Sequence, residues 1–536
     1  MFINRLTKTL KSWTNKAPEP TSAPGPPKKQ PLSRNYEDNI KKLQQLFANC
    51  ADVQFHPFQI NLEEPVRAFI IYATTITDNQ VISDSILKTL LEETRKLQQL
   101  TKGGNANLLQ IIQDSLLNLT ETSTVSNLDE VERKVFAGNA VLIIDGSSSA
   151  LAAGVRGGEN RSIVESDTEP GVRGPKDGFI ESIDTNMSLI RRRLKTSRLK
   201  LETLEVGELT HTKIAVCYIQ GIVNEQLLQE VKQRIGRIKT DSILEGSYIE
   251  ELIMDEQYSL FPLVQYTERP DKVTASLLEG RIAILVDNSP MPLLIPATFI
   301  TMLQAAEDYY HGSVFATFTR ILRLIALNLA LLLPSVTVAV FSFHQELLPT
   351  HLVSSVAGTR QGLPLPIALE ILVIEFTFEL LREAGIRLPK TIGQAISTVG
   401  GLVIGQAAVN AGLVSPISVI VVATTAIASF SIPNYDAGYA LRILRFMLIL
   451  LASFLGGVGI MFGLMIILIH LCSLRSFGVP YLIPFAPLSL GEIKDILVRA
   501  PWWAMSKRPK SFRTVNPTRQ KDNQGPSKPK YRRKRS

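Results

Sequence analysis

At 536 residues the chain has room for more than one folding unit, and 45% of its residues are hydrophobic, so part of it is expected to lie in a membrane. Its formal net charge is +8, yet twelve Lys and Arg and one Asp lie within residues 507–536, which leaves about −3 for the remainder. The basicity thus belongs to one tail, and this distribution argues against a nucleic-acid-binding protein.

Residues 1–35 are predicted to form a disordered basic and Pro-rich tail. Residues 1–16 carry scattered Lys and Arg but no continuous apolar stretch, which is unlike a secretory signal peptide. A short basic amphipathic helix on a membrane surface is an alternative for these residues. Residues 17–32 are rich in Pro, as in an extended linker.

A first soluble α/β subdomain is expected over residues 36–156. Helical spacing of apolar residues and runs with strand composition give the pattern, and Asp145-Gly146 is typical of a hairpin turn. The expected elements are helices over 38–48 and 83–101 and strands over 66–72, 140–144 and 150–155.

A linker is predicted at residues 157–177, which are rich in Gly, Pro and charged residues. A second soluble α/β subdomain over 178–288 is expected to follow, because helix-like and strand-like segments alternate again. Its expected elements are a helix from about 178 to Arg193, strands over 199–206, 213–219 and 281–286, and a helix over 224–238.

The soluble subdomains carry no recognisable enzyme motif. A Walker loop, a dinucleotide-binding glycine pattern, a metal-spaced His pair and a nucleophile elbow are all missing from the sequence. Cys50, Cys217 and Cys472 are far apart, so neither a disulfide framework nor a metal site is indicated. We therefore expect a protein that is not an enzyme and that uses no cofactor and no metal.

An α-helical transmembrane domain is predicted over residues 289–490. Its apolar runs approach or exceed the roughly 20 residues that a membrane span requires. They cover 321–342, 365–381, 392–411, 413–432 and 441–472, and the last run is over-long and broken at Gly456-Gly457. The number of crossings stays open, and an even number would place the soluble region and the basic tail, 491–536, together on the cytoplasmic side.

The run 392–411 is apolar but crowded with small and amide side chains. At about 100° per residue, two opposite stripes emerge. One stripe holds Val399, Val403, Gln406 and Asn410, and the other holds Gly401, Gly405, Ala408 and Gly412. Small residues let helix backbones approach closely, whereas amides avoid hydrocarbon. Two interpretations stay open, a packed transmembrane helix and a helix that lines a water-filled path.

The run that begins at residue 365 is unusually acidic. Glu375, Glu379 and Glu383 share one arc of the predicted helix, and Glu370 stands apart. Three acids on one arc are unlike a lipid-facing span. Either the helix lies in the membrane interface, or Glu370, Glu375 and Glu379 border an acidic aqueous vestibule.

Several long motifs occur in order along the chain and match one protein family. They are Arg173-Gly174-Pro175, residues 178–181 (GFIE), residues 189–193 (LIRRR), residues 306–310 (AEDYY), residues 379–385 (ELLREAG), VGGLVIGQAAVNAGLVSP and SFGVPYLIPFAPL. From about residue 40 to about residue 490 the chain resembles the A subunit of the GerA family of bacterial spore germinant receptors. Asn410, where a Gln is expected, is a minor departure.

This resemblance implies an integral protein of the spore inner membrane, whose soluble region and tail are cytoplasmic. It implies a transporter-like B subunit that binds the nutrient and a lipoprotein C subunit as partners. It also implies self-association into a ring, expected to be a pentamer, that conducts monovalent cations. The hypotheses that follow are a nutrient-gated cation channel, and as alternatives a carrier, a non-conducting scaffold or signalling subunit, and an A-like germination amplifier.

Overall fold

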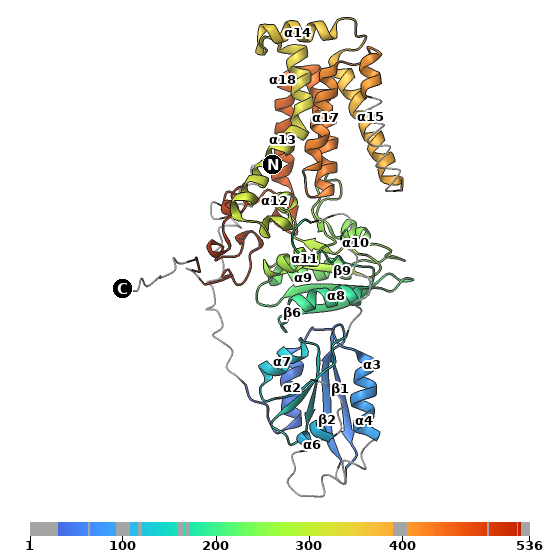
Figure 1. Ribbon diagram of the computed structural model, residues 1–536, viewed down its shortest axis with the longest axis vertical. Coiled ribbons are helices and arrows are strands. Elements are labelled where there is room, and N and C mark those ends of the chain that lie inside the picture. Colours follow the sequence, from blue (N-terminus) through green and yellow to red (C-terminus); the bar gives the residue numbers. More distant parts are fainter. Residues whose placement is uncertain are drawn as a thin grey trace, which may run out of the picture.

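The computed structural model describes residues 30–62, 65–92, 108–115, 121–157, 166, 169, 171–389, 405–489, 492–521 and 524–526. Two α/β subdomains and a helical part follow one another along the long axis of the molecule (Figure 1). This organisation agrees with the predicted fold class, a soluble α/β region of two subdomains followed by an α-helical domain.

The first subdomain is a five-stranded antiparallel sheet with the strand order β1-β2-β4-β5-β3. Its strands are β1 (Val53–Ile60), β2 (Val66–Ala73), β3 (Thr122–Val125), β4 (Asn139–Ile144) and β5 (Ala150–Gly154). Helices cover both faces, so alternate residues of β2 enter different cores: Phe69 and Ile71 lie in one, and Ala68 and Ile70 lie in the other. The predicted strands are confirmed, whereas β1 and β3 were not predicted.

The helices of this subdomain separate into two layers around the sheet. The helices α2 (Tyr36–Leu46) and α7 (Leu128–Val135) supply one core. The second core takes residues from the π-helix Ile82–Leu87, α4 (Lys88–Glu92) and α6 (Leu108–Ser115), while α3 (Asn79–Val81) leads into the π-helix. The chain is already packed at Leu32, which is buried, so order begins before the predicted boundary at residue 36.

The second subdomain repeats this plan with the strand order β6-β7-β9-β10-β8, again antiparallel. Its strands are β6 (Leu199–Val206), β7 (Thr212–Ile219), β8 (Gln265–Tyr266), β9 (Ile282–Val286) and β10 (Leu293–Ile295). Its helices are α8 (Ile183–Arg193), α9 (Glu225–Gly236), α10 (Gly246–Ile253) and α11 (Pro270–Leu278). A further strand, β10, follows β9, so the sheet extends beyond the predicted end at residue 288.

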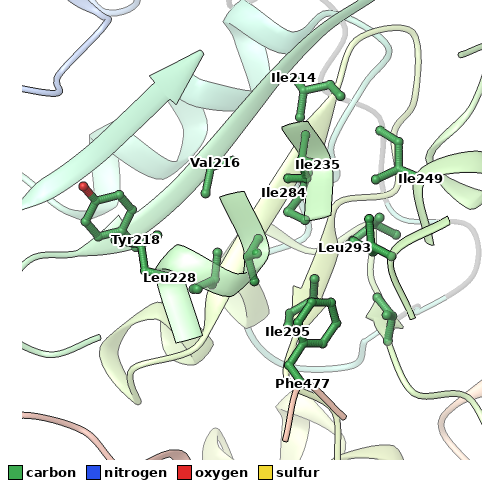
Figure 2. Packing of buried hydrophobic residues seen from close by; sticks show 14 of the residues in the cluster. Ile214, Val216, Tyr218, Leu228, Ile235, Ile249, Ile284, Leu293, Ile295 and Phe477 are labelled. Carbon is green, nitrogen blue, oxygen red and sulfur yellow. The ribbon is translucent and has the colours of Figure 1, made fainter. Parts of the chain in front are cut away.

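One core of the second subdomain is completed by a residue that follows the long helices in the sequence. Phe477 belongs to the turn between the short strands β11 (Arg475–Ser476) and β12 (Val479–Pro480), and its side chain is buried beside Ile295 (Figure 2). The guanidinium carbon of Arg234 on α9 lies 4.5 Å from the centre of the Phe477 ring. The soluble and helical parts therefore share a hydrophobic core.

The helical part begins with α12 (Phe299–Leu303) and the 3-10 helix Ala306–Tyr309. It continues with α13 (Ser313–Phe343), the 3-10 helix Gln345–Leu347, α14 (Thr350–Arg360), α15 (Ile367–Arg387), α17 (Pro416–Phe430) and α18 (Tyr435–Ser473). Among the described residues, α13 and α18 are the helices long and apolar enough to cross a membrane, and α14 lies across the far end (Figure 1).

Helix α18 is a hairpin rather than one long span. Gly456 has φ 58° and ψ −138°, and the chain reverses there, so that Gly463 lies against Leu448 and Gly459 against Leu451. Both ends of α18 lie next to the second subdomain, because Asp436 accepts a hydrogen bond from Tyr266 and Ser476 donates one to the Leu263 carbonyl. The break predicted at Gly456-Gly457 is confirmed, and it divides α18 into an outgoing and a returning leg.

The segment after residue 491, predicted as a basic tail, is folded where the structure describes it. It carries the 3-10 helices Ile493–Asp495, Trp502–Ala504 and Lys510–Phe512. Asp495 pairs with Arg320 of α13 at 3.0 Å, and Arg519 pairs with Glu279 of the second subdomain at 2.7 Å. Residues 492–521 therefore form a strap from the base of α13 to the second subdomain.

Candidate functional site

Glu370, in the first turn of α15, is buried and holds the start of α17. Its carboxylate accepts hydrogen bonds of 2.9 Å from both the Ser415 backbone N–H and the Ser418 hydroxyl. The Arg360 guanidinium at the end of α14 lies 3.1 Å from the same carboxylate. A carboxylate at a helix N-terminus is favoured by the helix dipole. Glu370 therefore joins three helices at the far end of the helical part.

Glu375 and Glu379, one turn apart on α15, pair with two arginines of the outgoing leg of α18. Arg445 lies 3.0 Å from Glu375 and 3.2 Å from Glu379, and Arg442 lies 2.9 Å from Glu379. The side chains of Glu375 and Arg445 are both 1% exposed. Charges buried at this depth need partners, because an unpaired charge in a low-dielectric environment is costly. The pairs therefore bind α15 to α18 within one chain.

The acidic positions were predicted, but these arginine partners were not. Arg442 and Arg445 stand more than sixty residues further along the chain, three residues apart in an otherwise apolar run. That spacing puts both on one helix face and is the signal that could have identified them. Among the vestibule candidates, Glu379 borders a cavity of about 250 Å³, whereas Glu370 and Glu375 are buried inside the chain.

The structure describes the second half of the amide stripe, the predicted helix face that holds Val399, Val403, Gln406 and Asn410. Residues 405–410 are helical, and Gln406 and Asn410 are both exposed. A Cβ at Gly405 would lie 3.7 Å from Val419 of α17, so the small-residue side meets a neighbouring helix there. Ala408 and Gly412 are half-buried, while Val399, Gly401 and Val403 lie outside the described residues.

The segment that carries the exposed amides is followed by exposed apolar residues. Leu413, in the turn before α17, is 51% exposed, and Ile420 and Ile427 on α17 are 64% and 70% exposed. Large exposed apolar residues in a helical part are typical of surfaces that meet lipid or another subunit. Gln406 and Asn410, by contrast, require water or a polar partner. This part of the chain therefore exposes both apolar side chains that are compatible with lipid and amides that are not.

Comparison with known proteins gives consistent matches along the chain. The family described as Bacillus/Clostridium GerA spore germination protein matches residues 41–511. "Spore germination protein KA" of Bacillus subtilis is 43% identical over 495 residues, covering 92% of this chain and 90% of that protein. The "Uncharacterized membrane protein YfkQ" of the same organism is 43% identical over 488 residues, covering 91% and 93%.

A solved structure also matches the soluble region. It is the N-terminal domain of the A subunit of the Bacillus megaterium spore germinant receptor GerK3, which is 32% identical and covers 51% of this chain and 99% of its own, with a TM-score of 0.41. The family match covers most of this chain and includes both the soluble subdomains and the helical part. The chain belongs to the GerA family of spore germination proteins.

Proposed function

We propose that this protein is the A subunit of a nutrient germinant receptor in the inner membrane of the spore, where it triggers germination. Its family and its relatives named as spore germination proteins support this role. A transporter-like B subunit that binds the nutrient and a lipoprotein C subunit would complete the receptor, as the family resemblance implies. The A subunit would then convert nutrient binding into an ion flux.

The exposed amides carry the channel proposal. Gln406 and Asn410 are four residues apart on one helix, so they share a face, and both are exposed. In hydrocarbon this face would leave two amides unsatisfied. A ring of protomers, as in the expected pentamer, would instead turn the face toward a central aqueous path for monovalent cations.

Val399 and Val403 extend the same stripe in the sequence, toward the start of the predicted run. Valines contributed by each subunit around a pore form a hydrophobic constriction that closes the pore by dewetting. Amides line a pore without trapping a cation. Gly401, Gly405, Ala408 and Gly412 would pack behind the pore-lining stripe. We leave the acidic helix out of the pore, because Glu370 and Glu375 are buried and Glu379 is paired with two arginines.

The test compares three variants of the predicted pore helix in spores. Val403→Ala should widen the constriction and release ions without nutrient. Val409→Ala is the matched control, because Val409 stands about a quarter turn from the stripe. Gly405→Leu should instead reduce the amount of assembled receptor, because Gly405 faces Val419 of α17. A Val403→Ala receptor that assembles normally and stays closed would show that this helix is not the gate.

Ion flux through the purified protein in liposomes separates the channel from its alternatives. A channel passes cations down their gradient at a rate far above that of a carrier. A scaffold, a signalling subunit or an A-like amplifier passes none. Absence of flux from assembled protein, with and without the B and C subunits, would favour the non-conducting role.

A further inference from the structure

A cavity of about 250 Å³ lies between the second half of α15 and the outgoing leg of α18. Its polar lining comes from Glu379, Arg382, Glu383 and Arg442. Its apolar lining includes Phe376, Leu380 and Ile386, which are 60%, 55% and 56% exposed at the surface of the helical part. The cavity therefore joins a charged interior to an apolar outer surface.

The carboxylates around this cavity already have cationic partners. Glu379 is paired with Arg442 and Arg445, and Glu375 behind it is paired with Arg445. Glu383 is paired with Arg387 at 2.7 Å. Each of these three carboxylates thus has an arginine partner, of which the exposed Arg387 does not line the cavity, and Arg382 adds one positive charge in excess.

Arg382 carries that excess charge. No carboxylate among the described residues lies within ion-pair distance of it, and its guanidinium instead lies 4.9 Å from the centre of the Phe430 ring. Its Nη1 is buried without a hydrogen-bond partner, and the same is true of Nη2 of Arg442, which lines the same cavity. Buried donors of this kind are normally satisfied, so the two arginines together lack an anionic acceptor.

The height of the cavity in the helical part matches a membrane interface. Arg442 stands two helical turns, about 10 Å, beyond Tyr435 at the start of α18. Tyr435 and Tyr439 are both partly exposed there, and tyrosines gather where hydrocarbon meets headgroups. This end of the helical part is the one beside the second subdomain, because Asp436 is bonded to Tyr266.

We propose that this cavity binds the headgroup phosphate of an anionic phospholipid. Arg382 and Arg442 would donate to the phosphate oxygens, which suit guanidinium groups well. The exposed Phe376, Leu380 and Ile386 would contact an acyl chain, which accounts for an apolar surface beside a charged cavity. Basic pockets between membrane helices are established sites for acidic headgroups. Free phosphate would satisfy the arginines but leave the apolar surface bare.

The experiment uses the purified full-length protein in detergent and two single-charge variants of α15. Arg382→Gln removes the unpaired guanidinium without breaking an ion pair in the described residues. Arg387→Gln is the matched control. It removes the same charge five residues further along α15, and the Arg387 side chain is 78% exposed. The probes are phosphatidylglycerol, phosphatidylcholine and inorganic phosphate, and the readouts are lipid retained in native mass spectra and the thermal midpoint.

Phosphatidylglycerol should be retained by the unchanged protein and by Arg387→Gln, and should raise their thermal midpoints more than phosphatidylcholine does. Arg382→Gln should retain it at least about fivefold more weakly, the effect of about 1 kcal/mol per basic residue at a lipid surface. Equal retention by Arg382→Gln and Arg387→Gln would overturn the site.

Two further results would overturn the lipid as the occupant. One is inorganic phosphate stabilising the unchanged protein as strongly as phosphatidylglycerol does. The other is Arg382→Gln altering the oligomeric size of the protein while lipid retention is unchanged, which would assign the cavity to a neighbouring subunit. Neither result depends on channel activity, so failure of the lipid site is distinguishable from failure of the proposed function.

Discussion

Asp52 and Arg191 form a fully buried ion pair that joins the two soluble subdomains. The Asp52 carboxylate accepts two hydrogen bonds of 2.7 Å from the Arg191 guanidinium, which also lies 4.4 Å from the centre of the Phe136 ring. Beside this pair, Cys50 of the first subdomain makes a β-bridge to Leu201 of the second. The subdomains are therefore in direct contact, in addition to being connected by the predicted linker.

Removing one partner of this pair should destabilise the soluble region strongly. We expect Asp52→Asn to lower the free energy of unfolding of residues 30–297 by about 3 to 5 kcal/mol, because it leaves the Arg191 charge buried without its counter-charge. Denaturant titration of this fragment measures the effect. Asp145→Asn is the control, since its partner Arg67 is 47% exposed and the loss should stay below about 1 kcal/mol. Similar losses in the two variants would contradict the assignment.

Glu250 on α10 should make stability depend on pH. Burial, together with the charges of Asp436 and Glu245, raises its pKa from 4.5 to about 7 in the folded protein. A raised carboxyl pKa lowers stability as the pH rises from the unfolded pKa toward the folded one. We therefore expect Glu250→Gln to stabilise the protein above pH 7 and to lose this advantage as the pH falls toward 4.5.

Thermal unfolding of the full-length protein between pH 4.5 and pH 8 tests this dependence around the folded pKa of about 7. Glu251→Gln is the matched control, because Glu251 is the next residue and is exposed. A stability difference between Glu250→Gln and the unchanged protein that stays constant with pH would show that Glu250 does not titrate in this window.

Phe477 should contribute to the stability of the second subdomain although it follows α18 in the sequence. Truncation of a buried Phe to Ala costs about 3 to 5 kcal/mol. For a folding unit of about 150 to 250 residues, that loss corresponds to a thermal unfolding midpoint lower by about 6 to 20 °C. Phe485→Ala in the same connecting segment is the control, since Phe485 is 42% exposed. Equal midpoints for the two variants would show that Phe477 does not hold the subdomain together.

Gly456 should be indispensable to the hairpin of α18. Its φ of 58° and ψ of −138° are accessible essentially to glycine, and a Cβ there would come within 2.9 Å of the Phe343 ring. We expect Gly456→Ala to reduce the amount of folded protein recovered from membranes. Gly438→Ala, in the same helix where a Cβ meets nothing within 4 Å, should be tolerated. Normal recovery of Gly456→Ala would mean that the chain turns elsewhere.

Strands with strong β composition could be predicted from the sequence, and strands that rely on tertiary partners could not. β6 spans Leu199–Val206 and β9 spans Ile282–Val286, close to the predicted 199–206 and 281–286. β1 lies at a sheet edge and contains Pro57 and three polar residues, so its composition resembles that of a loop. β8 has two residues, and among the described residues it pairs with β10.

The candidate site shows the same division. Periodicity within one helix identifies the acidic arc and the amide stripe, because both depend on residues three and four apart. The partners of those residues lie on other helices: Arg445 reaches Glu375 across seventy positions of sequence. The hairpin of α18 could likewise be predicted only in part, because a glycine pair in an apolar run indicates a break without giving its angle.

The strap of residues 492–521 has a consequence for the order of events during synthesis. The Val515 backbone N–H donates to the Ile222 carbonyl, and Arg281 of the second subdomain stacks beside Phe512, the centre of whose ring lies 5.8 Å away. At about 5 to 20 residues per second, the ribosome reaches Val515 about 15 to 60 s after Ile222. The last residues that cover the second sheet are therefore made only after every helix of the helical part has been synthesised, and a chain released early would carry an unfinished soluble domain.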